Sequence, residues 1–227
     1  MVLQKSTVGE LPFYYGGPSH RPAVIVLQEW WGVTPEVIQH AEYISEKGNY
    51  KVVVPDLYRG KTGVDAEEAS HLADGLDFGR ATEDIKEVVE WTRSSGSQKV
   101  GVTGFCQGGA LSCLAAEHTP VSCAVPFYGY PKSHPSKPES IKVPIMAHVG
   151  TEDKFFPCKE VEEYVEKIKA GGGNATVHVY PGEGHAFMNS DPDSFKRMET
   201  AGIPKGKPED QELAWKRTFD FFKQHLG

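Results

Sequence analysis

Residues 99–113 constrain the fold of this chain more than any other segment. They read Lys-Val-Gly-Val-Thr-Gly-Phe-Cys-Gln-Gly-Gly-Ala-Leu-Ser-Cys, a β-branched run followed by Gly-x-Cys-x-Gly and helix-forming residues. This order is typical of a nucleophile elbow, a strained strand-to-helix turn, with cysteine in place of the usual serine. Glycine is needed at Gly104 and Gly108 because a Cβ at either position would collide with neighbouring backbone. The pattern predicts a strand, a sharp turn at Cys106 and a helix directly after it.

The position of Cys106 also predicts its chemistry. A helix N-terminus offers free N–H groups and the positive end of the helix dipole, which favour a thiolate and an oxyanion beside it. We therefore interpret Cys106 as the nucleophile of an acyl-transfer reaction. The motif alone leaves an alternative open, namely a buried cysteine at a tight turn of an ordinary doubly wound protein.

Length and composition predict one domain, residues 1–227, with a core that needs no disulfide or metal. Hydrophobic residues make up 39% and charged residues 24%, which is ordinary for a globular protein. Cys106 and Cys113 would lie about 10 Å apart along one helix, too far for a disulfide. We interpret Cys113, Cys123 and Cys158 as core or surface residues without a chemical role.

The net charge of −7 argues against nucleic acid or an anionic membrane as a partner, because both require a basic surface. The first twenty residues contain no apolar block of signal-peptide length, and no window approaches the 18 apolar residues of a membrane span. We expect a cytoplasmic protein, monomer or homodimer, whose partner is a small-molecule substrate.

Short apolar runs alternate with amphipathic ones, which indicates an α/β fold with a mostly parallel central sheet and helices on both faces. Strands are expected at residues 23–28, 51–54, 99–103, 123–128, 143–149 and 175–180. Helices are expected after Cys106 and at residues 34–48, 81–93, 159–169 and 209–226. Glycine, proline and charged residues in segments 58–65 and 191–208 predict that neither forms a long regular element.

An activated nucleophile needs a base and a third group that orients the base, and an elbow protein carries them in the order nucleophile, acid, histidine. Asp153 follows the predicted strand 143–149, and His185 follows the strand 175–180. Both therefore stand at carboxyl ends of strands, where open α/β sheets bind ligands. Asp153 is the expected orienting acid and His185 the expected base, with Glu152 and Glu183 as rival carboxylates.

Five segments together resemble the dienelactone hydrolase family of the α/β-hydrolase superfamily. They are Gln28-Glu-Trp-Trp-Gly32, Val54-Pro-Asp-Leu-Tyr58, Gly104-Phe-Cys-Gln-Gly-Gly109, Gly150-Thr-Glu-Asp153 and Gly184-His-Ala-Phe187. The resemblance implies an α/β-hydrolase fold, a triad of Cys106, Asp153 and His185, and a Glu29 side chain that reaches the resting thiol. It also implies hydrolysis of lactones or activated esters through an acyl-enzyme, with no metal and no organic cofactor.

Glu29 has a physical rationale beside that resemblance. A permanently charged thiolate is open to oxidation, whereas a buried glutamate could take the thiol proton only when substrate rearranges the site. The oxyanion should be held by the backbone N–H groups of Trp30 and Gln107. Other side chains are expected either to line the substrate pocket or to pack in the core: Trp30, Trp31, Phe78, Tyr128, Phe155 and Phe187.

One residue departs from the family pattern. Members that cleave dienelactone hold the substrate carboxylate with arginines, one of them four residues after the catalytic histidine, and this chain has Asn189 there. Asn189 is therefore an expected substrate-binding residue, and Arg59 or Arg80 would supply the missing charge. An amide lacks the charge and the fork of a guanidinium, so we expect a preference for neutral substrates.

Two other functions fit the same motifs. The first is a noncatalytic sensor of oxidants or electrophiles that reacts through Cys106, although a sensor needs only an exposed thiol of low pKa and not Asp153 or His185. The second is a peptidase or acyltransferase, since fold and triad do not determine the acyl substrate or its acceptor.

Overall fold

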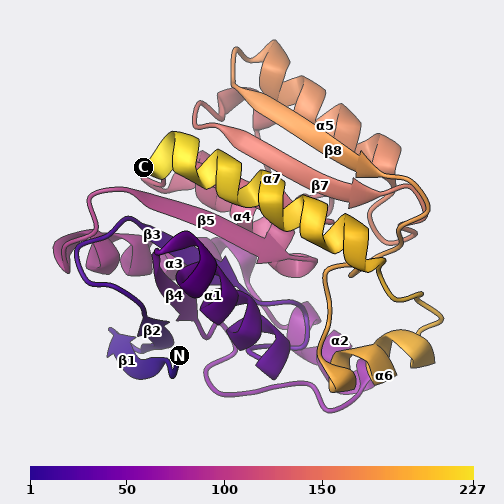
Figure 1. The fold of residues 1–227 in the computed structure, drawn as a ribbon, viewed down its shortest axis with the longest axis horizontal. Helices are drawn as coiled ribbons and strands as arrows, with labels where there is room; N and C mark the ends of the chain where they lie inside the picture. The colour runs from indigo at the N-terminus through magenta and orange to yellow at the C-terminus, as the bar shows by residue number, and fades with distance from the viewer.

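The computed structural model describes residues 1–227 and contains one eight-stranded sheet between two layers of helices (Figure 1). The strand order is β1-β2-β4-β3-β5-β6-β7-β8, in which the pairs β1–β2 and β2–β4 are antiparallel and all other pairs are parallel. The strands are β1 Gln4–Val8, β2 Leu11–Gly16, β3 Ala23–Leu27, β4 Lys51–Pro55, β5 Val100–Phe105, β6 Cys123–Phe127, β7 Ile145–Gly150 and β8 Ala175–Tyr180. This confirms the predicted fold class.

Each face of the sheet has its own hydrophobic core because alternate strand residues point to opposite sides. Ile25 and Leu27 of β3 pack in one core, and Val24 and Val26 pack in the other. The helices are α1 Pro35–Gly48, α2 Ala66–Asp74, α3 Phe78–Ser94, α4 Gln107–His118, α5 Cys158–Ala170, α6 Pro192–Thr200 and α7 Pro208–Leu226, with one 3₁₀ turn at Pro138–Ser140. Helices α3, α4 and α5 cover the first core, and α1 and α7 cover the second.

All six predicted strands and the predicted helices are present, with ends that differ by a few residues. Strands β1 and β2 and helix α2 are additional elements. None of the helices is long and apolar enough to cross a lipid bilayer.

Residues 191–208 form no long regular element, as expected, but they do contain the nine-residue helix α6. Proline occupies the first turn of this helix, where its missing N–H costs nothing, and the Asp191 side chain caps it by accepting a hydrogen bond from the N–H of Asp193 at 3.0 Å. The proline that argues against a helix in the sequence thus marks the helix start.

The turn between β5 and α4 brings backbone against backbone. A Cβ on Gly104 would overlap the carbonyl oxygen of Gly108, and a Cβ on Gly108 would overlap the carbonyl oxygen of Leu27. Both glycines are therefore required by close approach, as the sequence predicts. The contact seats the first turn of α4 directly on the carboxyl ends of β3 and β5.

Gly104→Ala should destabilise the fold by about 3 kcal/mol, since the added methyl group can be accommodated only by moving backbone. Urea unfolding measures the loss. Gly75→Ala is the matched control, because Gly75 ends α2 with φ −81° and its nearest neighbour would lie 3.3 Å from the new Cβ. Equal stability of the two variants would contradict the role assigned to the backbone contact.

Candidate active site

Cys106 lies at the turn between β5 and α4 with φ 56° and ψ −116°. A residue other than glycine rarely adopts a positive φ, and such strain is concentrated at functional sites. The side chain is half-exposed, while almost every other residue of α4's first two turns is buried. The turn therefore presents the sulfur to the space above the sheet.

Asp153 and His185 form a buried pair in the loops after β7 and β8. Nδ1 of His185 lies 2.8 Å from Oδ2 of Asp153. The other carboxylate oxygen of Asp153 accepts hydrogen bonds from the N–H groups of Phe155 and Phe156, each at 2.9 Å. These bonds fix the carboxylate, and the carboxylate in turn fixes the ring of His185.

The environment of His185 favours its charged form. Burial opposes protonation, but a negative charge at Cys106 and the hydrogen bond to Asp153 outweigh it and raise the pKa of His185 to about 10. The thiol of Cys106 is thus a close electrostatic neighbour of His185. The arrangement can support a thiolate–imidazolium pair.

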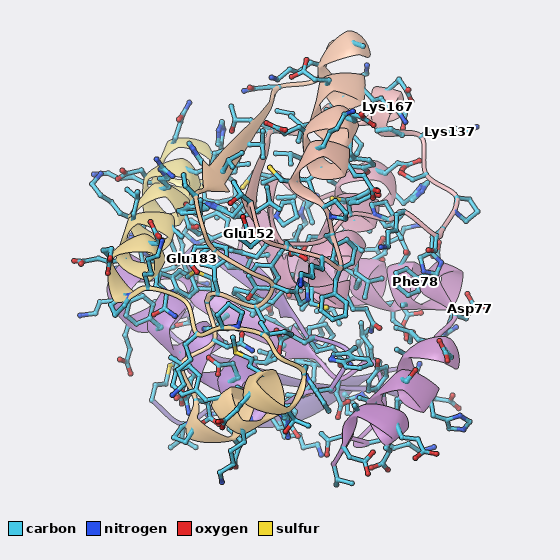
Figure 2. The ribbon with its side chains drawn as sticks, turned by 90° about the vertical axis from the view of Figure 1, so that its right-hand side faces the viewer. Asp77, Phe78, Lys137, Glu152, Lys167 and Glu183 are labelled. Carbon is cyan, nitrogen blue, oxygen red and sulfur yellow. The ribbon has the colours of Figure 1, made fainter.

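The alternative carboxylates, Glu152 and Glu183, do not form a hydrogen bond with His185. Glu183 accepts a hydrogen bond from the N–H of Lys207 at 2.9 Å, and Glu152 is exposed to solvent. Both appear in Figure 2 where the loops after β7 and β8 run together, and the N–H of Glu152 donates to the carbonyl oxygen of Glu183 at 2.9 Å. Neither side chain is hydrogen-bonded to His185.

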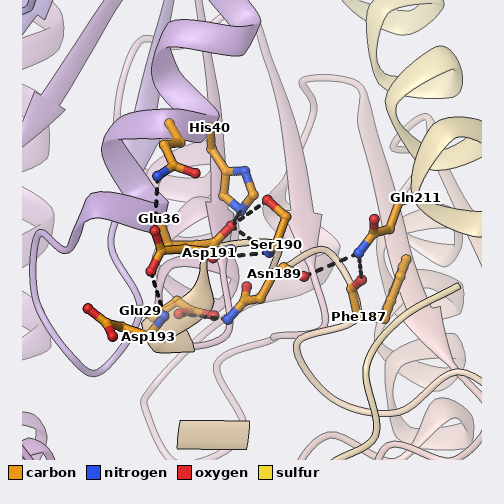
Figure 3. Close-up of polar contacts among 10 residues, drawn as sticks. Glu29, Glu36, His40, Phe187, Asn189, Ser190, Asp191, Asp193 and Gln211 are labelled. Atoms are coloured by element: carbon orange, nitrogen blue, oxygen red, sulfur yellow. Dashed lines mark hydrogen bonds and ion pairs between the residues drawn. The ribbon is translucent and has the colours of Figure 1, made fainter. Parts of the chain in front are cut away.

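Glu29 follows β3 and is only 3% exposed. Its Oε2 accepts one long hydrogen bond, 3.4 Å, from Nδ2 of Asn189 (Figure 3). Burial raises the pKa of Glu29 to about 7, with His185 and Asn189 opposing the rise and the nearby charge of Glu36 adding to it. Near neutral pH this carboxyl group is therefore poised between its charged and neutral forms.

Glu36 holds the loop that carries Asn189, although no sequence motif indicates it. Its carboxylate, in the first turn of α1, accepts hydrogen bonds from the N–H groups of Ser190 at 2.9 Å and Asp191 at 2.7 Å (Figure 3). From sequence this residue reads as an ordinary acidic residue at a helix start. Its contacts span more than 150 positions, so local sequence carries no signal of them.

Two backbone N–H groups are available for an oxyanion. The N–H of Trp30 donates no hydrogen bond within the chain. Gln107 is the first residue of α4, where helix geometry supplies no acceptor for its N–H. Gln107 directly follows Cys106, and the role of both N–H groups in binding an oxyanion stays a prediction.

Aromatic side chains surround His185 on two sides. Tyr128 meets its ring edge-on at 5.1 Å, and Phe155 lies 4.9 Å from it and is half-exposed. Phe187 packs against Tyr128 at 5.5 Å. Phe78 instead stacks on His134 at 3.4 Å, on the opposite side of Figure 2 from Glu183.

The arginine side chains are arranged differently from what the sequence suggests. Arg59 and Arg80 both pair with the buried Asp84, at 2.9 and 3.0 Å, so that each already has a carboxylate partner. Arg197 of α6 lies over the ring of Trp31, 4.7 Å from its centroid, and is close enough to Glu29 to influence its ionisation. Segment 191–208 is expected from sequence to be irregular, so Arg197 is not indicated there.

No group of three or more His, Cys, Asp or Glu side chains has the geometry to hold a metal ion. Burial raises the pKa values of Cys113 and Cys123 to about 12, which keeps both thiols protonated. Neither thiol is therefore in the thiolate form that a nucleophile requires.

The sheet order and the strained strand-to-helix turn define an α/β-hydrolase fold. Residues 11–226 match the dienelactone hydrolase family. The chain is 33% identical to Protein usf of Aquifex pyrophilus over 220 residues, covering 90% of this chain and 89% of the relative. It is 28% identical to a carboxymethylenebutenolidase of Rhodococcus opacus over 221 residues, covering 89% and 81%.

Among solved structures, a dienelactone hydrolase-like promiscuous phosphotriesterase from metagenomic libraries superposes with a TM-score of 0.85 at 18% identity, covering 100% of this chain and 99% of the other. The chain therefore belongs to the dienelactone hydrolase family, and by class it is a carboxylic ester hydrolase. The family prediction from sequence is confirmed.

Glu29→Gln should stabilise the fold at alkaline pH. A carboxyl group whose pKa rises from 4.5 to about 7 on folding lowers the free energy of unfolding as pH increases through that interval. The shift corresponds to at most about 3 kcal/mol, which the glutamine removes. Urea unfolding should give similar stabilities at pH 4.5 and a more stable variant at pH 8. A difference that does not change with pH would contradict the raised pKa.

Proposed function

We propose that this protein hydrolyses small esters or lactones through an acyl-enzyme on Cys106, with His185 as the base and Asp153 as its orienting acid. One observation carries the proposal. The ring of His185 is fixed by Asp153 at 2.8 Å on one side and is electrostatically coupled to the strained, half-exposed Cys106 on the other. A nucleophile, a base and an orienting group in contact are what covalent catalysis requires.

The reaction would proceed in two halves. The thiolate of Cys106 attacks the ester carbonyl, and the N–H groups of Trp30 and Gln107 bind the oxygen that becomes negative. Collapse of this intermediate breaks the ester bond, and the leaving alkoxide takes a proton from His185. Water then attacks the thioester while His185 accepts its proton, and the second collapse releases the acid and restores the thiolate and the protonated histidine.

Glu29 would govern the charge of the thiol. With a pKa of about 7, the carboxylate would accept the proton of the resting Cys106 thiol when substrate binds, and would return it to the thiolate after the acid has left, while His185 is protonated at the start and the end of each turnover. The long 3.4 Å contact with Asn189 leaves the carboxylate loosely held and able to turn.

The substrate would be neutral near the reacting carbonyl. Glu29, Glu36 and Asp153 bring three buried carboxyl groups to the site, and Asn189 supplies no charge. Lactone hydrolysis is consistent with the carboxymethylenebutenolidase name of the Rhodococcus opacus relative. The cytoplasmic location and the monomeric or homodimeric state remain predictions.

Cys106→Ala should lose nearly all turnover of a short aryl ester, because no other side chain can form the thioester. Mass spectrometry with a slowly deacylating ester should locate the acyl group on Cys106. Cys158→Ala, which removes another half-exposed thiol, should keep wild-type activity. An adduct on Cys113, Cys123 or Cys158 would overturn the assignment of the nucleophile.

His185→Ala and Asp153→Asn should each lower kcat by roughly a thousandfold or more, and the double variant should be little worse because the residues act as one unit. Steady-state kinetics of the three variants measures this. Glu152→Gln is the control and should retain its activity. A larger loss in that control than in Asp153→Asn would place the orienting acid elsewhere.

Asn189→Arg should raise kcat/KM for a carboxylate-bearing lactone relative to the neutral methyl ester of the same lactone, because a guanidinium adds charge and a bidentate donor. The wild-type protein should favour the neutral substrate. If it already favours the anion by tenfold, about 1.4 kcal/mol, then a cation already present holds it. Loss of that preference in Arg197→Gln would identify Arg197 as the cation.

A further inference from the structure

Tyr58 connects the segment after β3 with the first residue of α4, and these are the two places whose N–H groups are available for an oxyanion. It follows β4 and is only 7% exposed. Its hydroxyl donates a hydrogen bond to the carbonyl oxygen of Trp30 at 3.0 Å and accepts one from Nε2 of Gln107 at 3.1 Å. A single buried hydroxyl group thus bonds to both residues.

The position of Tyr58 is itself fixed. Oε1 of the fully buried Gln28 accepts a hydrogen bond from the N–H of Leu57 at 3.0 Å, which joins the end of β3 to the loop after β4. Asp56 accepts a hydrogen bond from the N–H of Gly60 at 2.8 Å and closes that loop on itself. The phenol therefore projects from a rigid turn rather than from a loose loop.

The hydroxyl keeps its proton at every working pH. Burial raises the pKa of Tyr58 to about 12, and the charge of Cys106 acts in the same direction. It can therefore donate to Trp30 and accept from Gln107 at the same time throughout the catalytic cycle. The side chain of Trp30 has fewer contacts of its own. It is half-exposed, and its one aromatic neighbour is the ring of Trp31, at 5.0 Å.

We propose that Tyr58 is a positioning residue for the oxyanion hole, holding Trp30 and Gln107 so that their N–H groups converge on one point. The inference rests on the proposed function, since it takes Cys106 as the nucleophile. Donors stabilise a developing negative charge best when they are fixed before the charge appears. Without the hydroxyl, the Trp30 carbonyl and the Gln107 side-chain amide lose their common partner, and the segment that carries Trp30 is no longer tied to the first turn of α4.

Tyr58→Phe removes this hydroxyl and keeps the ring. Turnover of an aryl ester should fall about 10- to 100-fold in kcat with little change in KM, because the hole acts on the transition state. Alkylation of Cys106 by iodoacetamide passes through no oxyanion, so its rate and pH dependence should match the wild type. Tyr164→Phe is the control, because Tyr164 is equally buried, its hydroxyl lies 3.2 Å from that of Ser136, and it should leave both reactions unchanged.

A second measurement separates positioning from damage to the fold. A trifluoromethyl ketone that adds to Cys106 forms a tetrahedral adduct, and Tyr58→Phe should weaken its binding by the same factor as kcat/KM. Wild-type kcat/KM in Tyr58→Phe would overturn the proposal, as would equal losses in turnover and alkylation. If that variant fails to fold, Gln107→Leu removes the same hydrogen bond from the other side, and a wild-type kcat there would also overturn it.

Failure of the proposed function has a different signature. Cys106→Ala would then keep its ester turnover, whatever the behaviour of Tyr58→Phe. An inactive Cys106→Ala combined with a fully active Tyr58→Phe would reject the role of Tyr58 alone.

Discussion

The site depends on the place where the first turn of α4 meets the ends of β3, β5 and β6 without side chains between them. Gly104, Gly108 and Gly129 leave no room for a Cβ, and a methyl group on Gly129 would overlap the carbonyl oxygen of Cys106. This contact forces Cys106 into its strained backbone conformation and sets the helix N-terminus beside the segment that follows β3. Glu29, Trp30 and the elbow are neighbours for that reason.

The buried carboxylates of the site differ in how fully they are compensated. Asp153 has two backbone N–H donors and His185, and Glu36 has the N–H groups of Ser190 and Asp191. Glu29 has a single amide donor at 3.4 Å. Burial without enough hydrogen-bond donors destabilises the charged form of a carboxyl group and raises its pKa. Glu29, which has the fewest donors of the three, is therefore the group whose protonation can change near neutral pH.

Sequence patterns predict the parts of this molecule that local chemistry determines. The alternation of apolar and amphipathic runs predicts the six central strands. The positions of the elbow, Asp153 and His185 at the carboxyl ends of these strands make them the expected site residues. Strand β1 is an edge strand and is mostly exposed, and the neighbouring β2 buries only Leu11 and Phe13, so neither has the apolar run of a buried strand. The contacts of Glu36 with Ser190, of Arg59 with Asp84 and of Tyr58 with Gln107 join distant segments, and only the folded chain reveals them.

The place of Glu29 beside Trp30 would also link the proposed nucleophile to the proposed oxyanion hole. A charged carboxylate next to an N–H group that receives a developing negative oxygen would oppose the reaction by repulsion. In the proposed mechanism, transfer of the Cys106 proton to Glu29 would create the thiolate and remove that repulsion at once. A glutamate with a normal pKa would rarely hold the proton at neutral pH, and one with a much higher pKa would seldom be ready to accept it. A pKa of about 7 permits both states, which gives a physical reason for keeping a poorly compensated carboxyl group in the interior despite its cost to stability.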